Sequence, residues 1–254
     1  MPADLKAFLD RKVREYNTPA FIAADPVSIP HRFTQPADIE IAGFFAALFA
    51  WGNRTTILRK SGELMRLMDD APHQFVTQHA DTDLRRFLGF KHRTFNPTDV
   101  LYLIAFLRQH YAQHDSLETA FLPGGKFIGM EAALDHFYGY VFSLPDAPPR
   151  SRKHIAAPFK GATCKRLNMY LRWMVRRDRQ GVDFGLWRAV RPSALVIPVD
   201  LHVARVARKL GLLGRPATDW KAAVELTDRL RSFDPDDPVR YDFALFSLGA
   251  EERF

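Results

Sequence analysis

Apolar residues recur along most of the chain at the three- and four-residue spacing of amphipathic helices. Such patterns predict helices over residues 5–16, 38–51, 55–68, 99–110, 130–142, 163–177, 200–210, 219–230 and 237–249. Alternating strand patterns are almost absent; the one short β-like run, 195–199, is interrupted by Pro198. The chain is therefore predicted to be all-α with short connections, and it shows no repeat at a fixed period.

Polar residues and prolines mark several of the predicted helix ends. Asp38 can cap the very apolar helix that follows it, and Asp237 with Pro238 forms an N-cap and N1 pair. Gly211 stands where a left-handed C-cap is expected. The proline-rich segment 143–158 is the clearest loop.

Composition narrows the class of protein. The longest uncharged apolar run, Ile41 to Trp51, has 11 of the 254 residues and is too short to cross a membrane. We therefore expect no membrane partner and a cytoplasmic location. Cys164 is the only cysteine, which excludes an internal disulfide and a four-cysteine zinc or iron–sulfur site. His110 and His114 have a spacing that could hold a metal on a helix, but we interpret them as two surface histidines and expect no metal or other cofactor.

The positive charge is concentrated in one segment. The chain has a net charge of +7, and residues 150–179 hold ten Lys or Arg against one acid, Asp178. That segment is thus +9, and the rest of the chain sums to −2. Such a concentration favours a positive face that binds a polyanion such as nucleic acid, although a solvated basic helix would give the same count.

The most basic helix follows a glycine turn in the sequence KGATCKRLNMYLRWMVRRD. Gly161 can adopt a positive φ angle, and Thr163 can cap the helix. A helix N-terminus beside a tight turn is a favourable phosphate-binding site. Lys165 lies in the first turn of this helix.

A second marked stretch is IPVDLHVARVARKLGL, residues 197–212. Asp200 stands at the entry of its helix, directly after an apolar lead-in. On its own, the carboxylate would be interpreted as an N-cap.

These two stretches resemble motifs of the helix-hairpin-helix DNA glycosylases, the superfamily of endonuclease III and the adenine glycosylases. IPVDLHVARVARKLGL resembles the VDTHV-x-R-V-x-x-R-L-G-L stretch, whose aspartate, matching Asp200, is the catalytic carboxylate. GATCKRLNMYL resembles the hairpin G-V-G-R-K-T-A-N-V-V-L. The hairpin lysine, matching Lys165, is the Schiff-base nucleophile of the bifunctional members.

Two further stretches resemble the superfamily more loosely. FFAALFAWGNRTTI, residues 44–57, is similar to an early helix and turn whose tip fills the gap left by a flipped base. RYDFALFSLGA, residues 240–250, is similar to the N-x-A-L-M-D-L-G-A helix of the adenine glycosylases. The resemblance covers most of the chain from Asp38 onward. The core KRLNMYLRWMVR also resembles an uncharacterised bacterial family.

The chain departs from the superfamily pattern in three respects. Thr163 replaces the second hairpin glycine, which can distort the phosphate-binding turn. The connection from Lys165 to Asp200 is longer than in endonuclease III and is more like that of the archaeal 8-oxoguanine glycosylases. The chain ends where the iron–sulfur cysteines would begin, so no cluster is expected. The stretch FLPGGKF, residues 121–127, imitates the hairpin but is interpreted as a turn.

The resemblance implies a two-lobed helix-hairpin-helix fold, with one lobe at 35–175 and the other at 1–34 plus 176–254. It implies a glycosylase with abasic-site lyase activity that removes a damaged base from duplex DNA, with an oxidised purine as the first candidate. Lys165 would be the nucleophile and Asp200 the acid. The expected DNA contacts are Asn53, Arg54, Lys160, Gly161, Thr163, Arg166, Arg172 and Arg176. The expected base-stacking residues are Trp51, Phe184, Trp187 and Phe246.

Local alternatives stand beside several of these assignments. Asn53 and Arg54 can wedge into a duplex or simply form a turn, and the four aromatic residues can stack on a base or pack in the core. For the whole protein, the alternative is a non-catalytic DNA- or RNA-binding protein with the same fold. For the glycosylase we expect a monomer that binds double-stranded DNA with a damaged base or an abasic site and is associated with the bacterial nucleoid.

Overall fold

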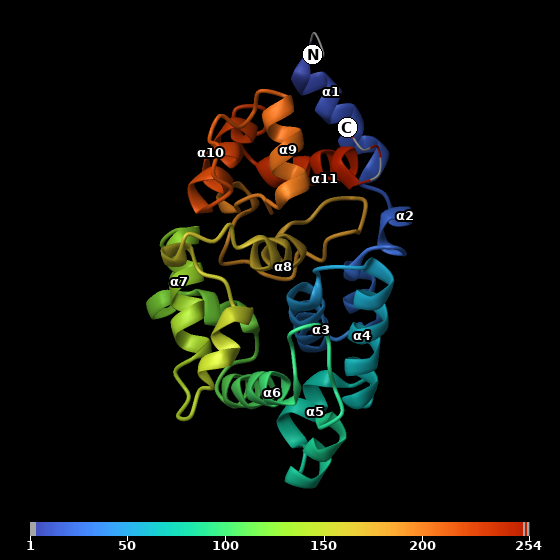
Figure 1. Cartoon of the computed structure of the whole chain (residues 1–254), viewed down its shortest axis with the longest axis vertical. Helices are drawn as coiled ribbons and strands as arrows, with labels where there is room; N and C mark the ends of the chain where they lie inside the picture. Colours follow the sequence, from blue (N-terminus) through green and yellow to red (C-terminus); the bar gives the residue numbers. More distant parts are fainter. Residues whose placement is uncertain (1–3, 251, 253) are drawn as a thin grey trace. The chain divides into compact units, whose positions relative to one another are not determined.

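The computed structural model describes residues 4–250, 252 and 254, and its regular elements in this part of the chain are helical (Figure 1). The prediction of an all-α protein is confirmed. The β-like run 195–199 is irregular chain, and the strand-like pairing among the described residues is limited to one bridge between His92 and Phe95. None of the described helices is long and apolar enough to cross a membrane.

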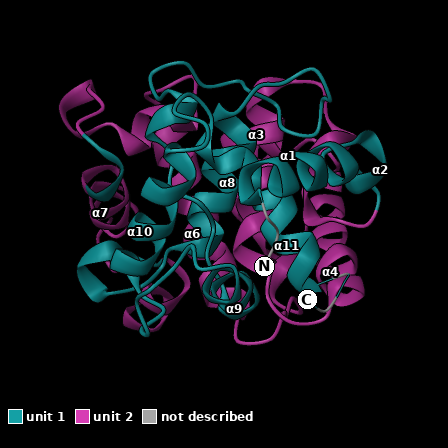
Figure 2. Ribbon diagram, turned by 90° about the horizontal axis from the view of Figure 1, so that it is seen from above, with its two compact units in different colours: residues 1–23, 129–131, 156–254 teal, residues 24–128, 132–155 magenta. Residues whose placement is uncertain are grey.

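The chain forms two compact units, coloured teal and magenta in Figure 2. Unit 1 comprises residues 1–23, 129–131 and 156–254, and unit 2 comprises residues 24–128 and 132–155.

These units differ from the lobes expected from the sequence, which ended at residue 175. The helix after the glycine turn groups with the C-terminal segment rather than with residues 35–155. The physical reason is that Arg172 of this helix and Arg176, its C-cap residue, form ion pairs with Asp242 and Asp237, far along the chain.

Unit 1 contains six α-helices with both termini of the described chain. They are α1 (Leu5–Tyr16), α2 (Pro19–Ile22), α8 (Lys165–Val175), α9 (Leu201–Lys209), α10 (Trp220–Arg231) and α11 (Asp242–Ala250). Helix α11 contacts both α1 and α9 (Figure 1). Gly249 permits the close approach of α9, because a Cβ at this position would lie 3.2 Å from the Cβ of His202.

Unit 2 is built around a helix that is buried along most of its length. Its helices are α3 (Pro36–Phe49), α4 (Arg54–Leu67), α5 (Pro72–Gln78), α6 (Pro97–Tyr111) and most of α7 (Met130–Val141). Every residue from Ile39 to Phe49 is buried, and α3 contacts both α4 and α5. The strongly apolar sequence of α3 from Ile41 to Phe49 follows from this central position.

Short 3₁₀ helices connect many of these elements. They are η1 (Pro26–Ser28), η2 (Pro30–Arg32), η3 (Asp81–Phe87), η4 (Leu117–Phe121), η5 (Pro123–Gly125), η6 (Pro149–His154), η7 (Pro158–Lys160), η8 (Pro192–Ala194) and η9 (Pro238–Tyr241). Most begin at a proline, whose fixed φ angle and missing N–H suit the first helical position. The segment 143–158, which was predicted to be a loop, contains the short helix η6. The interpretation of FLPGGKF, residues 121–127, as a turn agrees with η4 and η5.

Some predicted helix caps are confirmed and others are wrong. The backbone of Gly211 is left-handed, with φ of 71°, at the end of α9, as predicted. Asp38, expected to cap α3, lies inside that helix and accepts a hydrogen bond from the N–H of His73 instead. Asp237 and Pro238 are the N-cap and the first residue of η9, as predicted, but the Asp237 carboxylate pairs with Arg176 and makes no side-chain cap.

A buried carboxylate links α3 to α6 and η4 within unit 2. Glu40 is 2% exposed and accepts hydrogen bonds from the hydroxyl groups of Tyr111 (2.7 Å) and Ser116 (2.5 Å) and from the N–H of Leu117 (2.9 Å). Three donors compensate for the water that the carboxylate loses, so this polar group is compatible with the apolar surroundings of α3.

His110, expected on the surface, is fully buried in α6. Its ring nitrogens lie 3.1 Å from the hydroxyl oxygen of Tyr140 and 3.0 Å from the carbonyl oxygen of Ser116. Burial lowers the pKa of His110 to about 4, because the apolar surroundings disfavour the charged ring. The folded protein therefore holds a neutral imidazole at pH 7.

We predict that His110 makes the protein acid-sensitive. The folded pKa lies below the ordinary value of 6.5, so its contribution to stability is complete above pH 6.5 and is lost as the pH falls toward 4. The loss should approach about 3 kcal/mol of unfolding free energy. Urea unfolding between pH 7 and about pH 4.5 measures it. His110→Gln should flatten the slope, whereas the same change at the exposed His114 should leave it intact; equal slopes in all three proteins would contradict the assignment.

Candidate functional site

The turn before α8 places Lys165 at the first position of that helix. Gly161 has φ of 72° and Cys164 has φ of 54°, so two residues of the turn have left-handed backbone. Cys164 is the N-cap and makes no side-chain cap, which corrects the expectation that Thr163 caps the helix. The carbonyl of Thr163 instead accepts a hydrogen bond from the side-chain amide of Asn168 at 3.0 Å. A non-glycine residue in left-handed conformation beside a candidate nucleophile marks local backbone strain.

Asp200 is the N-cap of α9 and simultaneously contacts Lys165. Its Oδ1 accepts hydrogen bonds from the N–H groups of His202 and Val203, both at 2.9 Å. Its Oδ2 lies 3.5 Å from the Nζ of Lys165. The cap and the ion pair thus use different oxygens of one carboxylate, and the N-terminal end of α9 further favours its negative charge.

The Lys165–Asp200 pair is accessible from solvent. The side chain of Lys165 is 25% exposed and that of Asp200 is 26% exposed. Both residues belong to unit 1, although 35 positions separate them in sequence (200 minus 165). The two residues singled out by the sequence motifs therefore lie together, at the N-terminal ends of two helices, where an external molecule can reach the amine.

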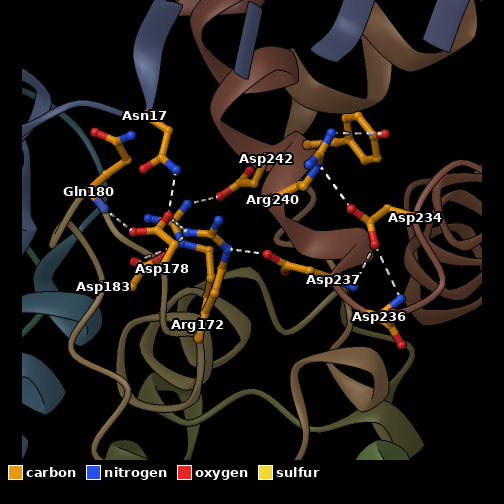
Figure 3. A network of polar contacts seen from close by, with 12 residues as sticks. Asn17, Arg172, Asp178, Gln180, Asp183, Asp234, Asp236, Asp237, Arg240 and Asp242 are labelled. Carbon is orange, nitrogen blue, oxygen red and sulfur yellow. Dashed lines mark hydrogen bonds and ion pairs between the residues drawn. The ribbon is translucent and has the colours of Figure 1, made fainter. Parts of the chain in front are cut away.

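A network of ion pairs in unit 1 holds Arg172 of α8 and Arg176, the C-cap residue of that helix (Figure 3). Arg172 contacts Asp242 through Nη1 and lies 3.3 Å from Asp183 through Nε. Arg176 pairs with Asp183 at 3.0 Å, with Asp237 at 2.8 Å and with Asp178 at 2.6 Å.

The burial of these arginines corrects two of the expected DNA contacts. Arg172 and Arg176 are each 3% exposed, so neither guanidinium can reach a phosphate. Their positive charge is compensated by acids that lie outside the basic segment of the sequence, notably Asp183, Asp237 and Asp242. The count of +9 thus overstates the charge that this segment presents to solvent.

The network contains more carboxylates than guanidinium groups. Four aspartates, Asp178, Asp183, Asp237 and Asp242, share two arginines. Burial raises the pKa of Asp242 to about 6, against the attraction of Arg172, and burial likewise raises the pKa of Asp237. The pKa of Asp178 is lowered, because hydrogen bonds from Asn17 (2.6 Å) and Arg176 outweigh the effect of burial. Burial therefore favours the protonated, neutral form of Asp242 and Asp237 more than it would for an exposed aspartate.

The remaining expected DNA contacts have mixed environments. Lys160 and Gly161 are exposed in the turn before α8, and Thr163 and Arg166 are partly exposed. Asn53 caps α4 by accepting a hydrogen bond from the N–H of Thr56 at 3.0 Å, which is the turn interpretation of this position. The other interpretation, that Asn53 and the partly exposed Arg54 enter a duplex, stays a prediction.

Of the four expected base-stacking aromatics, Trp187 is a core residue. It is 2% exposed and packs edge-on against Tyr170, with ring centroids 5.4 Å apart. Trp51 is partly exposed, and the guanidinium of Arg93 lies over its ring at 4.3 Å. Phe184 and Phe246 are partly exposed in unit 1. Three of the four are thus partly exposed.

The basic segment is also partly compensated within unit 2. Arg150 reaches Asp99 at 2.5 Å, and the same carboxylate accepts a hydrogen bond from the hydroxyl of Ser151 at 2.7 Å. Against the effect of burial, which raises it, hydrogen bonds from Ser151 and from the backbone N–H of Asn96 lower the pKa of Asp99. These contacts attach η6 to the start of α6 and leave Arg150 less available to an external anion.

Sequence reasoning missed Asp183 and Asp242. Asp242 is the first residue of α11, and its carboxylate is almost completely buried at 8% exposure. The available signal was the acid in RYDFALFSLGA, where the similar helix of the adenine glycosylases has an uncharged asparagine. An acid at the start of a helix with no polar face is a candidate for a buried ion pair.

No group of three or more His, Cys, Asp or Glu able to hold a metal occurs among the described residues.

Comparison with known proteins assigns the chain to a family. The profile described as "Protein of unknown function (DUF2400)" matches residues 25–251. The chain therefore belongs to this family, whose match includes both Lys165 and Asp200. Neither a curated protein nor a solved structure matches the chain.

Proposed function

We propose that this protein is a base-excision DNA glycosylase with abasic-site lyase activity, in which Lys165 is the nucleophile and Asp200 the catalytic carboxylate. The observation that carries the proposal is the 3.5 Å contact between the Lys165 amine and the Asp200 carboxylate on two accessible helix ends. The order of the two residues along the chain and their flanking motifs, which resemble the helix-hairpin-helix glycosylases, support the same assignment.

The chemistry requires an amine and an acid next to one sugar carbon. Cleavage of a base–sugar bond develops positive charge on the sugar, and the nearby Asp200 carboxylate stabilises it. The neutral amine of Lys165 forms a bond to that carbon while the base departs with the bonding electrons. The sugar ring then opens to an imine, from which a proton and the 3′ phosphate can be eliminated, so the strand is cut.

The proposed partner is duplex DNA carrying a damaged base, with an oxidised purine as the first candidate substrate. The base must leave the stack to reach the amine, at a cost of a few kcal/mol. The exposed Lys160 and the left-handed turn at Gly161 offer contacts to the DNA backbone next to Lys165. Such a partner would place the protein at the bacterial nucleoid.

Borohydride trapping on abasic-site DNA tests the proposal. We expect a covalent protein–DNA adduct with the wild-type protein and its complete loss in Lys165→Gln, which removes the amine but keeps a polar side chain of similar length. Lys126→Gln, a change at an exposed lysine of unit 2, is the matched control and should trap normally. Salt-sensitive DNA binding without an adduct would favour the alternative, a non-catalytic nucleic-acid-binding protein.

A further inference from the structure

Leu201 is the most exposed of the large apolar side chains in the described part of the chain, at 77%. The other strongly exposed ones are between 61% and 67% exposed, and they are Leu88, Ile128 and Phe159. Single exposed leucines are common on protein surfaces, so exposure alone assigns no function. Leu201 differs in its position, because it directly follows Asp200 at the start of α9 and therefore adjoins the accessible contact between Asp200 and Lys165.

The local structure does not require an apolar side chain at this position. The Asp200 carboxylate already satisfies the first turn of α9 by accepting from the N–H groups of His202 and Val203. Leu201 is not among the buried residues of α9, which are Val203, Ala204, Val206 and Ala207. The motif VDTHV, which this stretch resembles, has a polar threonine where this chain has Leu201. The leucine thus serves neither the cap nor the core, and its surface is available to a ligand.

The face of α9 that carries Leu201 continues with positive charge. Arg205 and Arg208 follow Leu201 by four and seven positions (205 minus 201 and 208 minus 201), so the three residues lie along one face of the helix. Helix α9 contains no acid. The arginines donate hydrogen bonds to carbonyl oxygens, Arg205 to that of Gly249 at 3.3 Å and Arg208 to that of Pro216 at 2.8 Å. Because these acceptors are uncharged, they do not neutralise the two guanidinium groups.

This arrangement fits a ligand that is apolar beside the Lys165–Asp200 contact and anionic along α9. A DNA strand with one nucleotide outside the stack has both properties, because the rotated deoxyribose presents C–H groups and phosphates flank it on both sides. We infer that Leu201 packs against the deoxyribose of that nucleotide and so gives the protein its preference for duplexes with a missing or damaged base. The inference rests on the DNA-binding part of the proposed function and adds the group of the substrate that is recognised.

The preference follows from the different roles of the two kinds of contact. Phosphate contacts such as those offered by Arg205 and Arg208 are the same for every duplex and carry no selectivity. The contact with Leu201 forms only when a nucleotide has left the stack, and a nucleotide without a base leaves it at the lowest cost. Leu201 therefore contributes to the binding of an abasic duplex and not to the binding of an intact one.

Fluorescence anisotropy with two duplexes of one sequence tests the inference. One duplex carries a tetrahydrofuran residue, a stable analogue of the abasic sugar, and the other is intact. Leu201→Ser is expected to weaken binding to the tetrahydrofuran duplex by about tenfold, because it removes most of the buried apolar contact. Binding to the intact duplex should change by less than about twofold, since the phosphate contacts remain. Leu201→Met keeps a flexible apolar side chain and should retain the preference.

Leu88→Ser is the matched control, because it removes a similarly exposed leucine from unit 2. We expect it to keep the wild-type preference for the tetrahydrofuran duplex. An unchanged preference in Leu201→Ser, or an equal loss in Leu88→Ser, would overturn the inference. Sedimentation equilibrium examines a second copy of the chain as the occupant instead: a wild-type dimer that dissociates in Leu201→Ser would also overturn it.

Borohydride trapping on abasic-site DNA separates this inference from the proposed enzymatic function. If the wild type traps DNA and Leu201→Ser keeps the full preference for tetrahydrofuran, the enzyme stands and the role of Leu201 fails. If no protein traps DNA but Leu201→Ser loses the preference, the contact stands as a property of a non-catalytic DNA-binding protein. Absence of binding to either duplex would contradict both proposals.

Discussion

Asp200→Asn is expected to lower base release by about a thousandfold or more while leaving DNA binding nearly unchanged. The substitution removes the negative charge next to the Lys165 amine. It keeps the helix cap, because Asn is as good an N-cap as Asp and its oxygen can accept from His202 and Val203. Single-turnover excision on a panel of lesion-bearing duplexes, beginning with 8-oxoguanine, measures the rate, and fluorescence anisotropy measures the affinity.

Asp219→Asn is the matched control for this experiment. Asp219 caps α10 by accepting from the N–H of Ala222 at 3.0 Å, in the same way that Asp200 caps α9, and its salt bridge is with Arg215 rather than with Lys165. We expect excision to proceed at the wild-type rate in this variant. Normal excision by Asp200→Asn would remove the carboxylate from the mechanism and leave it a structural cap.

The contact between Lys165 and Asp200 could be anticipated from the sequence because each residue lies in a short motif at a helix end. A glycine turn fixes where α8 begins, and an acidic N-cap followed by an apolar stripe fixes where α9 begins. The local pattern therefore places Lys165 in the first turn of α8 and Asp200 at the N-cap of α9. That the two turns meet was implied by the family resemblance and not by the pattern itself.

The burial of Arg172 and Arg176 could not be anticipated in the same way. A helix with one apolar stripe is expected to expose its other faces, but every residue of α8 from Leu167 to Val175 is buried. The acids that compensate Arg172 and Arg176 lie up to 70 residues further along the chain. A charge count in a sequence window does not include such partners.

The division into units escaped prediction for the same reason. Residues 156–175 join the C-terminal segment, with which Arg172 forms a long-range ion pair. The proline-rich segment 143–158 contains this boundary, but its composition does not show with which unit the helix after it groups. The burial of His110 likewise depends on residues outside its local sequence pattern. Its spacing from His114 is typical of a surface pair, whereas its burial depends on Tyr140 and on the chain at Ser116.

Arg176→Ala is expected to destabilise the protein by about 3–5 kcal/mol, which is the usual cost of breaking a buried ion pair. The substitution leaves Asp183 and Asp237 without their shared cation in a site where water cannot replace it. Urea unfolding at pH 7 measures the loss. Arg177→Ala is the matched control, because the neighbouring side chain is exposed and its removal should change the unfolding free energy by less than about 0.5 kcal/mol.

The destabilisation by Arg176→Ala should also depend on pH. Because burial raises the pKa of Asp237, this acid takes up a proton as the pH falls, and a neutral acid no longer requires the missing guanidinium. The difference in unfolding free energy between variant and wild type should therefore shrink between pH 7 and about pH 5. If Arg176 contacted phosphate instead, its removal would weaken DNA binding with a smaller salt dependence and leave stability unchanged. The structure predicts the opposite results, namely a loss of stability and unchanged DNA binding. The reason is that the buried guanidinium of Arg176 compensates carboxylates inside the protein and cannot contact DNA.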